Sequence, residues 1–146
     1  MLESILVGTD GSDAAGVAVA HAVTLAASLG ARLQIVSAYE PVSERELRIG
    51  RLHVPRDVQV NLREEVLALL EASQRDAEAA GVARVETFAR VGDAADAILD
   101  VAEEQGSDLI VVGNKGMTGA TRFLLGSVPH KVSHHAPCSV MIVRAG

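Results

Sequence analysis

The sequence predicts an α/β protein with a parallel sheet, because short apolar segments alternate with longer amphipathic ones along its length. Three joints support this prediction: Gly30, Gly81 and Gly106 each follow an amphipathic segment and precede an apolar run within three residues. Glycine commonly ends helices because it adopts the left-handed conformation. Successive strand-helix-strand units form right-handed crossovers, which place helices on both faces of the sheet. We therefore predict a doubly wound fold.

Five short runs rich in branched apolar residues are the predicted strands. They are 4–8 (SILVG), 32–38 (RLQIVSA), 84–91 (RVETFARV), 109–113 (LIVVG) and 139–144 (SVMIVR). The continuous apolar runs at 4–8 and 109–113 are typical of strands that are covered on both faces. The sheet is therefore expected to form the central layer.

Four amphipathic segments are the predicted helices, at about 13–29, 57–80, 92–106 and 127–136. Short polar side chains that accept a hydrogen bond are preferred at the N-cap. We expect Ser12 or Asp13 to cap the first helix, Asp93 the third and Ser127 the last. Residues 40–56 are polar and irregular, and no element is predicted there.

Length and composition predict a soluble cytoplasmic protein with one domain, residues 1–146. The net charge of −6 argues against nucleic-acid and anionic-membrane partners, which need clustered cations. The lone Cys138 cannot form an intramolecular disulfide, which fits a reducing compartment. The first residues do not resemble a signal peptide, and no run approaches the roughly 20 apolar residues of a membrane span.

Two glycine-containing segments are expected on the functional edge of the sheet. Ligands of doubly wound folds bind beyond the C-terminal ends of the strands, where the strand order reverses. This places GTDGS (8–12) and GNKG (113–116) at that edge. A tight loop alone would explain the second segment, but the pattern continues to a Gly-Ser pair at a helix start, 126–127. A helix start offers free N–H groups to an anion, and glycines let phosphate oxygens approach the backbone.

The pattern G-x2-G-x9-G-(S/T) at residues 113–127 resembles the nucleotide-binding form of the universal stress protein family. ILVGTDGSDAA near the start, SDLIVVGNKG, LLGSV and APCSVMIV near the end are similar to that family too, so the resemblance covers the whole chain. It implies a Rossmann-like sheet of the adenine nucleotide alpha hydrolase type, with strand order 3-2-1-4-5. It also implies an adenine nucleotide at the edge, a role in stress response, and dimers that pair the last strand, Val140 to Val143.

The resemblance assigns roles to individual residues. It places the nucleotide phosphates against Gly113, Gly116, Gly126, Ser127 and the Val128 N–H. In the first loop, Gly8, Thr9 and Asp10 are expected at the nucleotide, although the family often has proline where this chain has Gly8. Asp10 would contact the ribose or phosphates through water and a metal ion such as Mg²⁺.

The base and ribose are expected beside the second and fourth strands. The resemblance assigns the adenine edge to the backbone of Ala38, and the ribose to Val112 and Gly113. Lys115 has two interpretations, a phosphate contact or a solvated loop lysine. ATP is the expected nucleotide, with AMP or cyclic AMP as alternatives, because SAY (37–39) and GSVPHKVSHHA (126–136) also resemble members that prefer cyclic AMP.

Two function classes follow, a regulatory module that binds nucleotide and a slow ATPase or phosphotransferase. We expect the module, because no general base aimed at a terminal phosphate is evident. Neither G-x4-G-K-(S/T) nor G-x-G-x-x-G occurs, which excludes the commonest phosphate loops. His130 and His134 have the spacing of a metal pair, but no third ligand is evident and a solvated helix face is expected.

Overall fold

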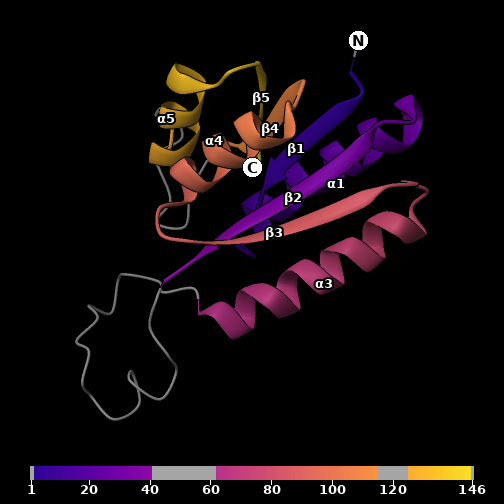
Figure 1. Ribbon diagram of the computed structural model, residues 1–146, viewed down its shortest axis with the longest axis horizontal. Helices are drawn as coiled ribbons and strands as arrows, with labels where there is room; N and C mark the ends of the chain where they lie inside the picture. Colours follow the sequence, from indigo (N-terminus) through magenta and orange to yellow (C-terminus); the bar gives the residue numbers. More distant parts are fainter. Residues whose placement is uncertain (1, 41–61, 115–124, 146) are drawn as a thin grey trace.

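The computed structural model describes residues 2–40, 62–114 and 125–145. Five strands form one parallel sheet in the order β3-β2-β1-β4-β5 (Figure 1), as predicted. The elements are β1 (Ser4–Gly8), α1 (Asp13–Leu29), β2 (Arg32–Tyr39), α3 (Arg63–Ala79), β3 (Val85–Val91), α4 (Ala94–Gln105), β4 (Leu109–Gly113), α5 (Ser127–His135) and β5 (Ser139–Val143).

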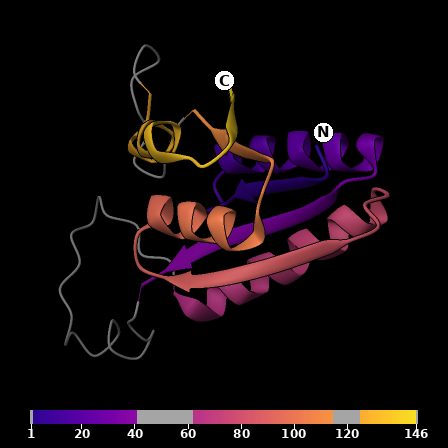
Figure 2. The same cartoon turned by 45° about the horizontal axis from the view of Figure 1, so that its top comes forward.

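Helices cover both faces of the sheet, so the molecule has three layers (Figure 2). Successive side chains of β1 point to opposite faces, and each joins a different core. Ile5 and Val7 pack with α1 and α3, whereas Leu6 packs with α4 and α5. Helix α1 presents a row of buried alanines, which lets it lie close to the sheet. No helix in the described segments has the length and hydropathy needed to cross a bilayer.

Most helix ends follow the predicted caps. Ser12 caps α1 by accepting from the Ala15 N–H at 3.2 Å, and Asp93 caps α4 by accepting from the Asp96 N–H at 3.0 Å. Gly30 and Gly106 end these helices with φ of 67° and 62°, a left-handed conformation that other residues rarely adopt.

Two predicted helix starts were wrong. Gly126, not Ser127, is the N-cap of α5, because the Gly126 carbonyl already accepts the His130 N–H at 3.0 Å. Helix α3 begins at Arg63 after an extended Leu62, and not at about residue 57. Residues 57–61 lie outside the described part of the chain.

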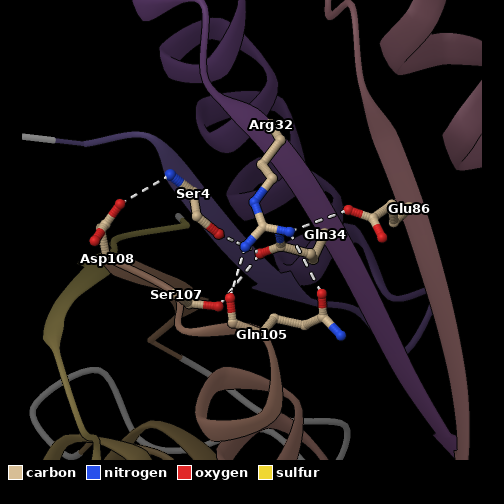
Figure 3. Close-up of polar contacts among 7 residues, drawn as sticks. All are labelled: Ser4, Arg32, Gln34, Glu86, Gln105, Ser107 and Asp108. Carbon is tan, nitrogen blue, oxygen red and sulfur yellow. Dashed lines mark hydrogen bonds and ion pairs between the residues drawn. The ribbon is translucent and has the colours of Figure 1, made fainter.

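Polar contacts connect the amino ends of the strands to one another and to the end of α4 (Figure 3). The Arg32 guanidinium donates to the backbone oxygen of Gln105, the last residue of α4, at 2.6 Å and pairs with Glu86 at 3.4 Å. Helix α4 has no basic residue in its own last turn, so a cation from β2 stabilises the negative end of its dipole.

A buried amide lies beside this cation (Figure 3). Gln34 Oε1 accepts hydrogen bonds from the Ser4 and Ser107 hydroxyls at 3.0 and 3.3 Å, and its Nε2 has no partner among the described residues. Asp108 accepts from the Ser4 N–H at 3.0 Å. These contacts fix β1, β2 and the start of β4 at the end of the sheet opposite to the predicted site.

Candidate functional site

A pocket opens at the carboxyl ends of β1, β2 and β4, between the first turns of α4 and α5. Its empty volume is about 480 Å³, a figure that includes the open solvent at its mouth. The lining residues are Gly8, Thr9, Asp10, Ala15, Val36, Ala38, Ala94, Ala97, Ile98, Val112, Gly113, Val128 and Pro129.

The position of the pocket follows from the strand order. β1 lies between β2 and β4, so the chain leaves β1 toward one side of the sheet and later returns on the other. The helices that make these two connections, α1 and α4, lie on opposite faces. A crevice therefore forms where the order reverses, which is the usual ligand site of doubly wound sheets.

Seven of the eleven residues predicted for the site line this pocket. They are Gly8, Thr9, Asp10, Ala38, Val112, Gly113 and Val128. Gly126 is buried and Ser127 exposed at the start of α5, next to Val128 but outside the lining. Lys115 and Gly116 lie outside the residues that the structure describes.

The loop after β1 is held by short polar contacts. The Thr9 N–H donates to the Val36 oxygen at 3.0 Å, and the buried Ser37 hydroxyl donates to the Thr9 oxygen at 2.6 Å. Asp10 Oδ1 accepts from the Ser12 N–H at 2.8 Å, and Gly11 takes a φ of 83°. Asp10 is thereby fixed at the mouth, and among the described residues that line the pocket it is the one with a charged side chain.

Asn114 positions the start of α5, a role that the sequence left open. Its backbone N–H donates to the Val143 oxygen at 2.9 Å, and its backbone oxygen accepts from the Gly126 N–H at 3.0 Å. Its Oδ1 accepts from the Ala145 N–H at 3.0 Å. The end of β4, the end of β5 and the N-cap of α5 are thus joined through one residue. Asparagine after an apolar run is a common turn signal, but its partners are not readable from the sequence.

The first turn of α5 supplies the positive end of a helix dipole to the pocket. The N–H groups of Ser127 and Val128 lie in that turn, where backbone donors have no intrahelical partner. Pro129, the third helical residue, has no N–H and contributes an apolar ring to the lining. An anion is favoured at such a helix start.

The α4 side of the pocket was not predicted. Ala94, Ala97 and Ile98 come from the first two turns of α4 and form an apolar wall. The sequence indicated that this helix has an inward face, but not that part of the face borders a cavity. The small side chains at 94 and 97 are the one signal that was available.

Charged residues at the same ends of α4 and α5 form a bridge. Lys131 Nζ lies 2.7 Å from Asp96 and 3.4 Å from Asp93, and the Asp96 carboxylate raises the lysine pKa above its ordinary value. Each partner is about half exposed, so this bridge contributes little to stability.

The remaining candidate groups are the histidines of α5 and the lone cysteine. His130 and His134 are exposed, as expected, with ring centroids 4.4 Å apart. Across the segments 2–40, 62–114 and 125–145 no three His, Cys, Asp or Glu side chains are grouped to hold a metal. Cys138 is half-buried, and burial raises the pKa of its thiol.

A second hollow lies on the opposite face, between α1 and α3. It is wider, with an empty volume of about 910 Å³ that again includes open solvent. Its walls come mainly from the two helices, including Gly16, Val23, Leu69, Ser73 and Asp76. Among the described residues that line it, the helix start near Ser12 is the one present, and none comes from β2 or β4.

The fold and pocket define a doubly wound α/β protein with a crevice at the reversal of strand order. The universal stress protein family model matches residues 1–144, and the chain belongs to this family.

Two curated relatives cover almost the whole chain. The universal stress protein YxiE of Bacillus subtilis is 38% identical over 99% of this chain and 100% of its own length. Rv1636 of Mycobacterium tuberculosis is 37% identical over 97% of this chain and 95% of its own. A universal stress protein solved in complex with cyclic AMP is 35% identical, with a TM-score of 0.74 over 99% of this chain and 98% of its own.

Proposed function

We propose that the protein is a regulatory module of the stress response that binds an adenine nucleotide in the pocket between α4 and α5. One observation carries this proposal: an apolar slot and a helix start that favours anions meet at the reversal of strand order. A nucleotide has the matching parts, an aromatic base that prefers apolar walls and phosphates that prefer backbone N–H groups.

The base would enter between β2, β4 and α4. Val36, Ala38 and Val112 offer apolar walls there, and the backbone of Ala38, next to the end of β2, can bond to the adenine edge. Val112 and Gly113 would contact the ribose. This arrangement leaves the phosphates at the side of the pocket where α5 begins.

The phosphates would lie against Gly113, Gly126, Ser127 and the Val128 N–H. Lys115 and Gly116 are proposed to complete this cradle. Asp10 fits a Mg²⁺ ion bound mainly by phosphate oxygens and water, because Mg²⁺ in nucleotide sites often takes only one or two carboxylates. Mg²⁺ would neutralise the phosphates, and Asp10 would orient one of its waters.

ATP is the first candidate because the glycine pattern that resembles ATP-binding members is complete in the sequence, from Gly113 to Gly126. Cyclic AMP is the second candidate, and the relative solved with cyclic AMP favours it. Cyclic AMP has no terminal phosphates and would need no Mg²⁺. AMP would use the same base and ribose contacts as ATP.

We also propose a cytoplasmic homodimer that pairs β5 of two copies. Ile142 is 39% exposed on this strand, which lies at the end of the sheet. A bare apolar strand edge favours association. The lone Cys138 is compatible with a reducing compartment.

Calorimetric titration of nucleotide-free protein tests the proposed function. ATP, AMP and cyclic AMP are each added with and without Mg²⁺. Tighter binding of ATP with Mg²⁺ supports the first candidate, and preference for cyclic AMP without metal supports the second. If none of the three nucleotides gave a heat of binding or competed with another, the result would contradict nucleotide binding.

A turnover assay separates the module from the alternative, a slow ATPase. If the protein acts as a module, ATP should stay unhydrolysed over many cycles of binding and release. Multiple turnovers that stop in the Asp10→Asn variant would establish an enzyme instead.

A further inference from the structure

Gly8 and Ile98 both line the pocket and lie against each other. Gly8 is the last residue of β1, and Ile98 lies on α4 with 4% of its surface exposed. A Cβ atom added to Gly8 would lie 2.5 Å from Ile98 Cδ1 and 2.9 Å from Ile98 Cγ1. The end of the isoleucine side chain therefore lies where a Cβ atom at position 8 would be, and it would have to move to admit a larger residue there.

Backbone conformation does not require glycine at this position, and the contact that a larger residue would meet is with the Ile98 side chain. Gly8 does not have a positive φ, whereas the nearby Gly11 does. Its backbone is paired in the sheet, opposite Val36 of β2. Contact with Ile98 is thus the constraint that the structure shows on this residue.

The isoleucine is held in place by the helix that carries it. Asp93 caps α4 one turn before Ile98, and Arg32 holds its last residue at the other end of the sheet (Figure 3). Ile98 also belongs to the core that includes Val36 and Val112. The wall cannot retreat from a bulky ligand without disturbing this core, because protein interiors are close-packed.

We propose that Ile98 sets the depth of the base-binding part of the pocket and so restricts the ligand to nucleotides with an unsubstituted adenine ring. This inference rests on the proposed function, because it concerns the base of the same ligand. The ring would contact the Ile98 methyl groups where these close over Gly8. A substituent on the buried edge of the base would collide with them.

Enlarging the pocket tests the proposal. Ile98→Ala removes the wall, and Ile98→Val removes only Cδ1 if the larger change unfolds the protein. Binding is measured by calorimetry for ATP and cyclic AMP and for their analogues with a benzyl group on N6 or a bulky group at C2 or C8. In Ile98→Ala, we expect the affinity of at least one analogue to rise tenfold or more relative to that of its parent nucleotide.

The neighbouring Leu99→Ala is the matched control, because Leu99 lies on α4 outside the pocket lining. It should leave the ratio of analogue to parent affinity unchanged. Equal ratios in wild type, Ile98→Ala and Leu99→Ala for every analogue would overturn the depth-setting role. A similar gain in Leu99→Ala would also overturn it, because the effect would then come from a loosened helix.

A double substitution tests the contact itself. Gly8→Ala should push Ile98 into the pocket and weaken binding of the parent nucleotide about tenfold. Gly8→Ala/Ile98→Ala should bind more tightly than Gly8→Ala alone, and absence of this rescue would contradict the contact. Wild-type protein that binds none of the parent nucleotides would overturn the proposed function as well, which distinguishes the two failures.

Discussion

Asp10 has one carboxylate oxygen engaged in structure. Oδ1 accepts the Ser12 N–H at 2.8 Å and closes the turn before α1. The asparagine amide keeps an acceptor at this position, so Asp10→Asn should preserve the turn and remove the charge. We expect the Mg²⁺-dependent part of ATP affinity to fall about tenfold, since hydrogen bonds to charged groups contribute roughly 1.5–3 kcal/mol. Calorimetry with and without Mg²⁺ measures this.

Asp13→Asn is the control for that charge change. Asp13 is exposed in the first turn of α1 and does not line the pocket. Its substitution should leave the Mg²⁺ dependence unaltered. Equal losses in the two variants would show a general charge effect and would remove Asp10 from the site.

Cys138 provides a prediction that is independent of the nucleotide. Its pKa is raised, first by burial and then by the charge of Asp108, so less of the thiol is ionised at neutral pH. The thiolate is the reactive form. Alkylation by iodoacetamide should therefore be slower than that of a free cysteine at pH 7.5 and should accelerate only at more alkaline pH. A rate at pH 7.5 that equals or exceeds that of free cysteine would contradict this environment.

At the scale of elements, the start of α4 both stabilises the helix and lines the pocket. Asp93 caps the helix whose first two turns carry Ala94, Ala97 and Ile98. Asp93→Ala should lower the free energy of unfolding by about 1 kcal/mol, the usual cost of losing such a cap. Urea denaturation measures the loss.

Asp93→Asn separates the cap from the ion pair with Lys131. Asparagine caps helices about as well as aspartate but has no charge. We expect its unfolding free energy to stay close to that of wild type, because the bridge is about half exposed. If the two variants lost the same stability, the ion pair and not the cap would be responsible.

The elements also show how far local signals predict a site. The loops at Gly8–Asp10 and Gly113 were predicted because an apolar run followed by glycine marks a strand end directly in the sequence. For Ile98 the sequence indicated only that its segment is amphipathic, since the contact with Gly8 depends on how α4 packs on the sheet. The partners of Asn114 were not predictable for the same reason, because they come from β5 and α5.

Helix starts were the least predictable feature. The cap of α5 fell on Gly126, whose N–H donates to the Asn114 oxygen and whose carbonyl accepts the first helical bond, although Ser127 is the residue with capping chemistry. Strand order was predicted through family resemblance, and the alternating pattern alone predicted only a parallel sheet. The phosphate contacts of Lys115 and Gly116 remain predictions.

At the scale of the whole molecule, the sheet ends in a strand with an exposed apolar side chain. Ile142→Lys places a charge on this edge, which should oppose pairing of two β5 strands. We expect a dimer in wild type and a monomer in the variant, measured by sedimentation velocity. Leu29→Lys is the control, because Leu29 is 52% exposed at the far end of α1. A wild-type monomer, or a variant that stays dimeric, would contradict the proposed interface.

The two hollows on opposite faces of the sheet allow a direct test of where the nucleotide binds. Amide chemical shifts of ¹⁵N-labelled protein are followed by NMR during titration with ATP and with cyclic AMP. The α4–α5 pocket predicts that the largest changes occur at Gly8, Gly113 and Val128, with Gly16 and Ser73 between α1 and α3 little affected. Changes centred on Gly16 and Ser73, or no changes at saturating nucleotide, would contradict the assignment of this pocket as the nucleotide site.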